Sequence, residues 1–242
     1  MHLFDPDRLT ASSGIVGAAA CTACGFALAN KRQGRGNVAV AFFGEGAVNQ
    51  GMVLEAFNLA VAWCLPVVFV CKDNRWAITT RSARVTGGKL EQRARAFGLA
   101  TSRVDGRRPW SVWKAAGRAI DRARRGRGPS FLLVRVTRPR GHFEDDPLLR
   151  MVRQPRELLH DAQGLLAEAT ANQDGQRWEH LLGLAEVART VVAMAYEQFM
   201  PSRDPLAATA RRLARADAIS IQSEARQVVE DAVAAALKVS GR

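Results

Sequence analysis

The stretch NVAVAFFGEGAVNQGMVLEAFNLAVAWCLPVVFVCKDN, residues 37–74, decides the fold of this 242-residue chain. Residues 37–43 are apolar and partly β-branched or aromatic, which is typical of a short buried strand. The glycine turn GEG at 44–46 ends this strand, and apolar residues at helical spacing follow over 48–64. The apolar run VVFVC at 67–71 is a second buried strand. Strand, helix and strand form one βαβ unit, which implies a parallel sheet and a right-handed crossover.

The flanking segments extend this α/β pattern in both directions. We predict helices over 15–31, 89–97 and 110–125, a polar break over 72–75 and a third strand over 131–136. No strand pattern is evident after residue 151, where the spacing predicts helices over 156–171, 177–199 and 205–238. The prediction is therefore an α/β domain over 1–150 and a helical C-terminal region over 151–242.

Composition and charge bear on whether the protein binds nucleic acid or enters a membrane. The net charge is +12, but the basic residues are scattered, with no aromatic interleaving and no recognisable nucleic-acid module. We therefore expect no nucleic-acid partner. The dense groups at 122–127 and 211–215 are interpreted as exposed helix faces or ends, and docking onto an acidic protein remains a second interpretation of the charge. We read no membrane span and no signal peptide, so the expected location is the cytoplasm.

The four cysteines are Cys21, Cys24, Cys64 and Cys71. The first two form a C-x-x-C pair, but no second pair or nearby histidine completes a zinc site. Packing of small residues in buried positions is favoured over metal or redox chemistry.

Two predicted strand ends carry polar residues that are unusual for tight turns. Ligands of parallel sheets bind at the carboxyl ends of the strands, and the glycine turn precedes a helix whose N-terminus favours an anion such as a diphosphate. Glu45 lies between the glycines and would repel phosphate unless a cation such as Mg²⁺ bridged them. The amide of Asn74 and the carbonyl of Trp76 would add oxygen ligands from the next strand end. The alternative is a tight turn with a solvent-facing glutamate, and the residues alone leave both interpretations open.

The order of several sequence blocks adds a resemblance. GEGAVNQG at 44–51, followed by DN at 73–74, resembles the thiamine-diphosphate motif, which is usually GDG followed by NN. The surrounding sequence is similar to the α subunits of the decarboxylating first component of 2-oxo-acid dehydrogenase complexes. The matching blocks are MHLFDPD at 1–7, GIVGA at 14–18, EAFNLAVAW at 55–63, LPVVFVC at 65–71, RVDG at 103–106 and GHFEDDP at 141–147.

The resemblance implies a thiamine-diphosphate-binding fold, a parallel sheet with helices on both faces, and a set of cofactor residues. Mg²⁺ would be held by Glu45, Asn74 and the Trp76 carbonyl, and His142 would reach the cofactor and take part in the reaction. The positions that match cofactor residues of the family are Gly14, Val16, Glu45, Gly46, Ala47, Asn74, Trp76 and His142.

The resemblance also implies an activity and partners. The enzyme would be an oxidoreductase that forms an enamine on thiamine diphosphate and passes the acyl group to a lipoyl disulfide. A β-type subunit would supply the glutamate that activates the cofactor, most simply in an α2β2 assembly. A lipoyl-bearing acyltransferase would be the second partner. The substrate signals conflict, with acetoin or pyruvate slightly ahead of a branched-chain 2-oxo acid.

The sequence departs from the family pattern in four ways, the last of which is that Leu149-Arg150 stands for the usual YR and that Arg203-Asp204-Pro205 comes about fifty residues later. Family members carry a longer N-terminal segment with a tyrosine–arginine pair that contacts the diphosphate, so we expect this chain to be N-terminally truncated. Glu45 replaces the usual aspartate, and Asp73 replaces the first asparagine of NN. These departures keep open an alternative in which the chain is a non-catalytic truncated paralogue that binds a β-type partner without turnover.

Overall fold

A four-stranded parallel sheet forms the centre of the computed structural model, which describes residues 2–78, 80–137 and 204–240 and isolated positions between 182 and 196. The strand order is β3-β4-β8-β7, and all three pairings are parallel. The strands are β3 (Ala39–Gly44), β4 (Val67–Asp73), β7 (Ala100–Asp105) and β8 (Ser130–Arg135). The predicted parallel sheet is confirmed.

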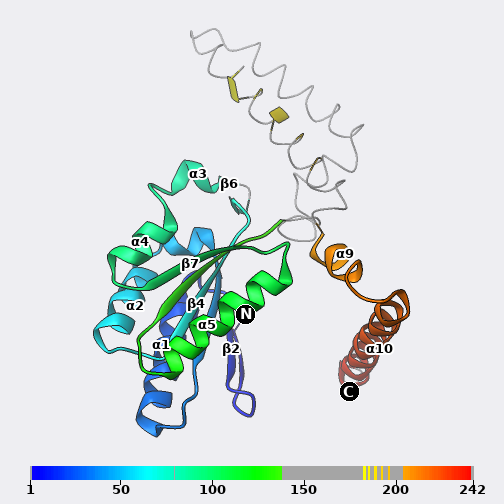
Figure 1. The fold of residues 1–242 in the computed structure, drawn as a ribbon, viewed down its shortest axis with the longest axis horizontal. Coiled ribbons are helices and arrows are strands. Elements are labelled where there is room, and N and C mark those ends of the chain that lie inside the picture. The colour runs from blue at the N-terminus through cyan, green and yellow to red at the C-terminus, as the bar shows by residue number, and fades with distance from the viewer. Residues whose placement is uncertain are drawn as a thin grey trace.

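Helices cover both faces of this sheet, as Figure 1 shows. The helices of this part of the chain are α1 (Ala18–Gln33), η1 (Glu45–Asn49, a 3₁₀ helix), α2 (Gly51–Ala62), α3 (Ser82–Val85), α4 (Leu90–Ala96) and α5 (Pro109–Arg124). Residues of α1, α2 and α4 pack on one face, and α5 packs on the other. The predicted fold class, a parallel sheet with helices on both faces, is therefore confirmed.

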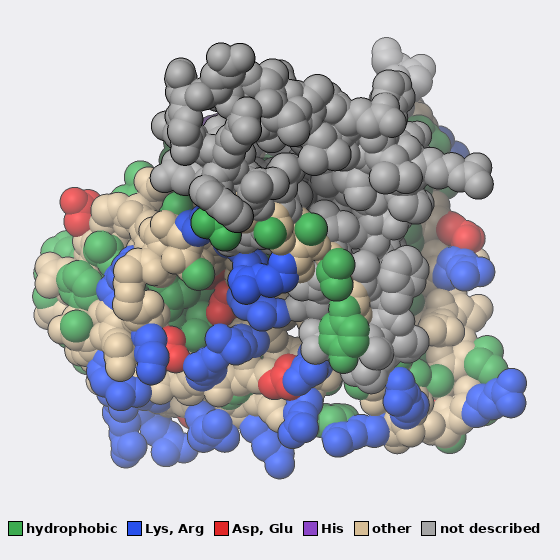
Figure 2. Space-filling model, turned by 90° about the horizontal axis from the view of Figure 1, so that it is seen from above, with side chains coloured by type: hydrophobic (Ala, Val, Ile, Leu, Met, Phe, Trp, Pro, Cys, Tyr) green, Lys and Arg blue, Asp and Glu red, His purple; other side chains and the backbone are tan. Residues whose placement is uncertain are grey.

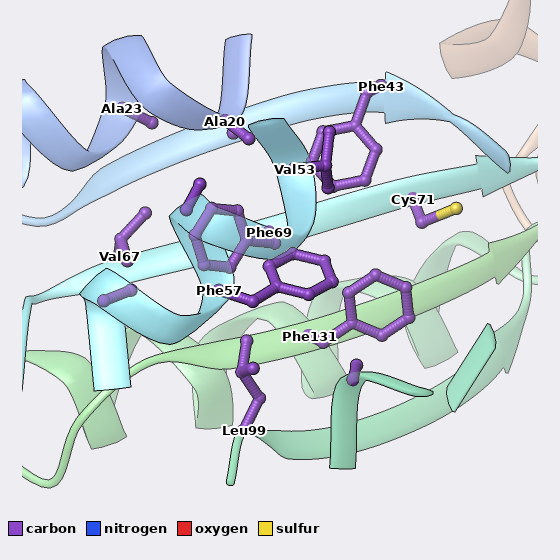
Figure 3. Close-up of a cluster of buried hydrophobic side chains, with 14 of the residues drawn as sticks. Ala20, Ala23, Phe43, Val53, Phe57, Val67, Phe69, Cys71, Leu99 and Phe131 are labelled. Atoms are coloured by element: carbon purple, nitrogen blue, oxygen red, sulfur yellow. The ribbon is translucent and has the colours of Figure 1, made fainter. Parts of the chain in front are cut away.

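The larger core lies under α1, α2 and α4 and is organised around one aromatic ring (Figure 3). Phe57 of α2 has no exposed surface and meets the rings of Phe69, Phe131 and Phe97 at centroid distances of 5.0, 5.6 and 6.2 Å. The tilted, edge-on arrangement of these rings is the preferred geometry for aromatic pairs. This cluster fixes α2 on the sheet, and with it the turn that precedes α2.

The opposite face is covered by small residues of α5. Ala115, Ala119 and Ala123 are buried at a spacing of four residues, which places them on one side of the helix. Their short side chains let α5 lie close to Val68 and Leu132 of the sheet. The last turn of α5 carries Arg122 and Arg124, which belong to the basic group predicted over 122–127. Figure 2 shows Lys and Arg side chains gathered along one edge of the molecule.

Several elements differ from the sequence prediction. The strand β4 continues to Asp73, where the polar residues after 71 indicated a loop. The helix predicted over 48–64 is α-helical only over Gly51–Ala62, because residues Glu45–Asn49 form the 3₁₀ helix η1. Two hairpins were not predicted, because their strands are short and lack an alternating apolar pattern. They are β1 (His2–Asp5) with β2 (Thr10–Ser13), and β5 (Trp76–Ala77) with β6 (Thr80–Arg81).

The described C-terminal elements are helical, as predicted. The expected helix over 205–238 is divided into α9 (Pro205–Ala210) and α10 (Arg215–Ser240). The predicted helix over 156–171 and the boundary between residues 150 and 151 lie outside the described residues. The two-domain division stays a prediction. Among the described helices, none combines the length and the apolar character that a membrane crossing requires.

The cysteines follow the packing interpretation only in part. All four are free, and Cys24 and Cys71 are buried, whereas Cys21 and Cys64 are exposed. Burial raises the pKa of the Cys24 thiol to about 12, which keeps it protonated and unreactive at neutral pH. The expected burial of Cys21 is wrong, because this residue is exposed, although its thiol donates to the Met52 carbonyl of α2 at 3.4 Å. No cluster of three or more His, Cys, Asp or Glu side chains suited to a metal occurs in the described part of the chain.

Candidate cofactor and metal site

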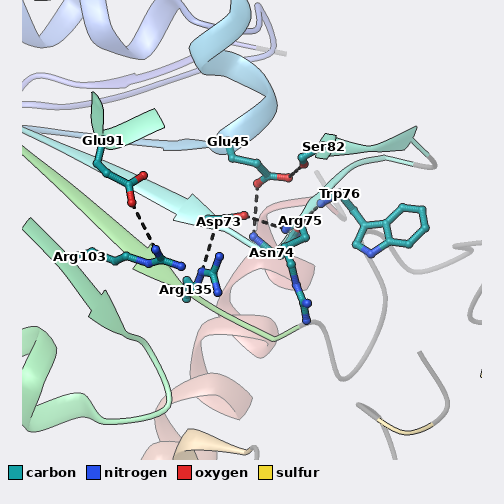
Figure 4. Close-up of polar contacts among 9 residues, drawn as sticks. All are labelled: Glu45, Asp73, Asn74, Arg75, Trp76, Ser82, Glu91, Arg103 and Arg135. Carbon is teal, nitrogen blue, oxygen red and sulfur yellow. Dashed lines mark hydrogen bonds and ion pairs between the residues drawn. The ribbon is translucent and has the colours of Figure 1, made fainter. Parts of the chain in front are cut away.

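The carboxyl ends of β3 and β4 bring Glu45 and Asn74 together. The two strands pair in register from Ala39↔Val67 to Gly44↔Lys72, so the residues that follow them meet at one edge of the sheet. The Asn74 backbone N–H donates a hydrogen bond of 3.3 Å to Oε2 of Glu45 (Figure 4). The expectation that a carboxylate and an asparagine face each other across adjacent strands is met by this contact.

Glu45 is a buried carboxylate rather than a solvent-facing turn residue. Its exposed fraction is 1 %, and the Ser82 hydroxyl donates a hydrogen bond of 2.6 Å to its Oε1. Among the described residues, no lysine or arginine forms an ion pair with it. A buried charge costs several kcal/mol of free energy unless it is paired or binds a metal. The alternative of a solvent-facing glutamate is therefore wrong.

A sharp turn after β4 places Asn74 and Trp76. Arg75 has a φ of 69°, a left-handed conformation that is uncommon for a residue with a side chain. The turn lets the Trp76 N–H donate to the Asn74 Oδ1 at 2.9 Å and the Arg75 N–H donate to Asp73 at 3.0 Å. Strained backbone of this kind clusters at binding sites. The three predicted metal ligands thus form one connected group, from Glu45 through Asn74 to Trp76.

The group opens into a cavity of about 690 Å³, a size within the ordinary range for small-molecule sites. Its charged lining consists of Arg75, Arg81, Lys89, Arg103 and Arg135 against Glu45, Asp73 and Glu91. Among the described lining residues, cations therefore outnumber carboxylates by five to three, and this excess favours an anionic ligand. A buried carboxylate inside a cationic cavity is the arrangement expected where a metal ion joins a diphosphate to the protein.

The negative charge of Asp73 is balanced by a neighbouring arginine. Its carboxylate lies 3.8 Å from Nε of Arg135, at the end of the neighbouring strand β8. The charge that this position adds relative to asparagine is therefore offset by a cation from the same sheet edge.

Gly46, the second glycine of the turn, lies too close to Ala77 for a side chain to fit. A Cβ atom built on Gly46 would lie 2.8 Å from Cβ of Ala77 in β5, nearer than real carbon atoms approach. The turn and the β5–β6 hairpin are therefore in direct backbone proximity. Ala47 follows in η1 and is buried.

The GIVG stretch lies beside the start of α2. Gly14 and Val16 are both exposed, and the adjacent Gly17 has a φ of 95°. A Cβ built on Gly17 would lie 3.1 Å from Met52 and 3.2 Å from Gln50. The stretch is thus next to the start of α2, and its predicted cofactor residues are accessible. His142 lies outside the described residues, and its role stays a prediction.

Two residues of the site were not predicted. Ser82 contacts Glu45, and Arg93 of α4 ties the turn in place through the Val48 carbonyl at 3.2 Å and Asn49 Oδ1 at 2.9 Å. Arg93 also donates to the Gly87 carbonyl at 2.9 Å. Neither residue stands in a motif, so only the tertiary arrangement reveals them.

Comparisons with known proteins identify a family to which the sequence is similar. The family described as Dehydrogenase E1 component matches residues 1–162. The α subunit of acetoin:2,6-dichlorophenolindophenol oxidoreductase from Cupriavidus necator is 40 % identical over 195 residues, which are 80 % of this chain and 55 % of that protein. The α subunit of the pyruvate dehydrogenase E1 component from Rhizobium meliloti is 33 % identical over 198 residues, covering 80 % of this chain and 57 % of that protein.

Among solved structures, benzoylformate decarboxylase from Polynucleobacter necessarius aligns with a TM-score of 0.41 and 20 % identity, over 53 % of this chain and 25 % of that one. The chain spans little more than half the length of the two curated relatives described above. The match over residues 1–162 covers most of the chain and includes every residue of the predicted site. This chain belongs to the dehydrogenase E1 component family.

Proposed function

We propose that this chain is an α-type subunit of a thiamine-diphosphate-dependent acetoin or 2-oxo-acid dehydrogenase and that it holds the diphosphate and Mg²⁺ of the cofactor. The observation that carries the proposal is the buried Glu45 carboxylate, which has no cation partner among the described residues. It lies beside Asn74 at the carboxyl edge of the sheet. Family membership supports the same conclusion.

The donor set fits the proposed metal. Mg²⁺ takes oxygen ligands and binds through one or two carboxylates together with phosphate oxygens. Glu45 supplies a carboxylate, and Asn74 and Trp76 would supply an amide and a backbone oxygen.

The chain's own residues would position the cofactor and screen its charge. Glu45 would bind the cation, the cationic cavity lining would stabilise the diphosphate, and the glycine turn would let the backbone approach it. When bound, thiamine diphosphate supplies the nucleophilic carbon and the electron sink for breaking the carbon–carbon bond beside a carbonyl. A β-type subunit would complete the site, and a lipoyl-bearing acyltransferase would accept the acyl group.

A calorimetric titration tests the proposal. Thiamine diphosphate is titrated into the chain mixed with the β-type chain encoded by the neighbouring gene, with Mg²⁺ and without it. We expect binding only when both the metal and the β-type chain are present. Absence of binding under all conditions would refute the proposal and favour the non-catalytic alternative.

A further inference from the structure

The shortest hydrogen bond to the buried Glu45 side chain comes from the hydroxyl group of Ser82. It donates 2.6 Å to Oε1 of Glu45 across 37 residues of sequence, as Figure 4 shows. The other contact of this carboxylate is the longer 3.3 Å bond from the Asn74 backbone. Ser82 belongs to no motif that the proposed function uses.

Ser82 is itself held by the backbone around it. Its N–H donates to the Arg75 carbonyl at 3.0 Å, and its carbonyl accepts from the Thr86 N–H at 2.8 Å. The far end of α3 is tied to the same turn as Glu45, because Asn49 Nδ2 donates to Thr86 Oγ1 at 2.9 Å. The hydroxyl is therefore presented to Glu45 from a segment that is fixed at both ends.

A hydrogen bond to Glu45 can affect how its carboxylate is oriented and therefore how well it binds a cation. Glutamate has one more rotatable bond than the aspartate usual at this position, so more freedom must be removed to aim its carboxylate. An ionised carboxylate offers about four lone-pair sites, and the two observed hydrogen bonds leave others for a cation. Groups that hydrogen-bond a metal-ligating side chain orient it and contribute to metal affinity.

We propose that Ser82 is a positioning residue, whose hydroxyl holds the Glu45 carboxylate in the orientation that binds the cation. Ser82 keeps its proton and donates it to Oε1, which leaves Oε2 directed toward Asn74 and the cavity. The inference rests on the proposed function, because it assumes that Glu45 binds a divalent cation together with thiamine diphosphate.

The test measures metal affinity rather than turnover. Mg²⁺ is titrated by calorimetry into the chain with its β-type partner at saturating thiamine diphosphate, and Mn²⁺ binding is followed by electron paramagnetic resonance. We expect Ser82→Ala to raise the dissociation constant for Mg²⁺ about tenfold and to alter the Mn²⁺ spectrum. Ser82→Thr, which keeps the hydroxyl, should restore both values.

Two controls separate positioning from a general structural effect. Thr80→Ala removes an exposed hydroxyl of β6, two residues before Ser82, and should leave the Mg²⁺ affinity unchanged. In a Glu45→Asp background, the carboxylate ends one bond further from Ser82, so adding Ser82→Ala should cause no further loss. If the wild type binds the cofactor and Ser82→Ala has the same dissociation constant for Mg²⁺, this inference is overturned and the proposed function is not. Absence of cofactor binding by the wild type overturns the proposed function and this inference together.

Discussion

Glu45 and Asn74 are 29 residues apart in sequence, yet the Asn74 N–H donates a hydrogen bond to the Glu45 carboxylate at 3.3 Å. The contact follows from topology, since Gly44 and Lys72 are paired residues of two parallel strands. The helix between the strands returns the chain to the same edge of the sheet. The proposed metal site is therefore built on the paired ends of two strands of the central sheet.

Glu45→Gln is expected to remove cofactor binding without unfolding the chain. The glutamine amide oxygen can still accept the Ser82 hydrogen bond, but the negative charge that is proposed to bind Mg²⁺ is lost. Because an unpaired buried charge is costly, the melting temperature of the chain alone should stay the same or rise. Calorimetry with thiamine diphosphate and Mg²⁺, together with thermal unfolding, measures both effects. Glu55→Gln changes an exposed glutamate of α2 and should alter neither. Magnesium-dependent binding retained by Glu45→Gln would contradict the assignment.

Gly46→Ala is expected to destabilise the turn and weaken cofactor binding. The new Cβ would lie 2.8 Å from Cβ of Ala77, so the turn or the hairpin must move. Overpacking of this kind costs about 1–3 kcal/mol of unfolding free energy. Urea denaturation measures this loss. Gly51→Ala is the matched control, because no atom lies within 4 Å of its built Cβ and alanine favours a helix. Equal stability of the two variants would show that the close approach does not constrain the turn.

The central part of the fold could be predicted from sequence because it depends on periodicity. The apolar strands and the helix between them specify the βαβ unit, and parallel pairing then brings Glu45 to Asn74. The ends of the elements were less predictable, because β4 runs on through the polar residues Lys72 and Asp73. Pairing with Val134 and Arg135 of β8 stabilises those residues as a strand, a tertiary effect that local sequence does not contain.

The Ser82–Glu45 contact could not be predicted. Two-residue strands have no period, and the β5–β6 hairpin that leads into Ser82 contains Ile78 and follows Arg75, which have φ values of 56° and 69°. Neither is glycine, so no sequence signal marks these left-handed positions. The roles of Gly14, Val16 and His142 come from resemblance and stay predictions.

Phe57→Ala is expected to lower the free energy of unfolding by about 3–5 kcal/mol, because it leaves a cavity among three aromatic rings. Phe57 has no exposed surface, whereas Phe42 on the edge strand β3 is 61 % exposed. Phe42→Ala is therefore a matched control and should change the stability of the isolated chain by less than about 1 kcal/mol. Urea denaturation followed by circular dichroism compares the two. A similar loss for both variants would mean that the Phe57 cluster does not anchor α2.

Asp105 is expected to add an acid-sensitive contribution to stability. Hydrogen bonds from the Arg107 side chain, at 2.6 Å for the closest, are the main cause that lowers the pKa of this carboxyl below its ordinary value of 3.8. A lowered folded-state pKa means that the contribution is fully present above the ordinary value. It is lost as the pH falls through the folded-state value. The pair is partly exposed, so its contribution should not exceed about 1 kcal/mol.

Unfolding free energies of the wild type and Asp105→Asn, measured from about pH 6 down to about pH 3, check this linkage. The difference between the two proteins should be largest near neutral pH and should shrink toward the acid end. Asp121→Asn removes an exposed carboxylate of α5 that forms no ion pair with another described residue, and it should show no such trend. A difference that stays constant over the whole pH range would mean that Asp105→Asn acts through packing rather than through loss of the charged hydrogen bond to Arg107.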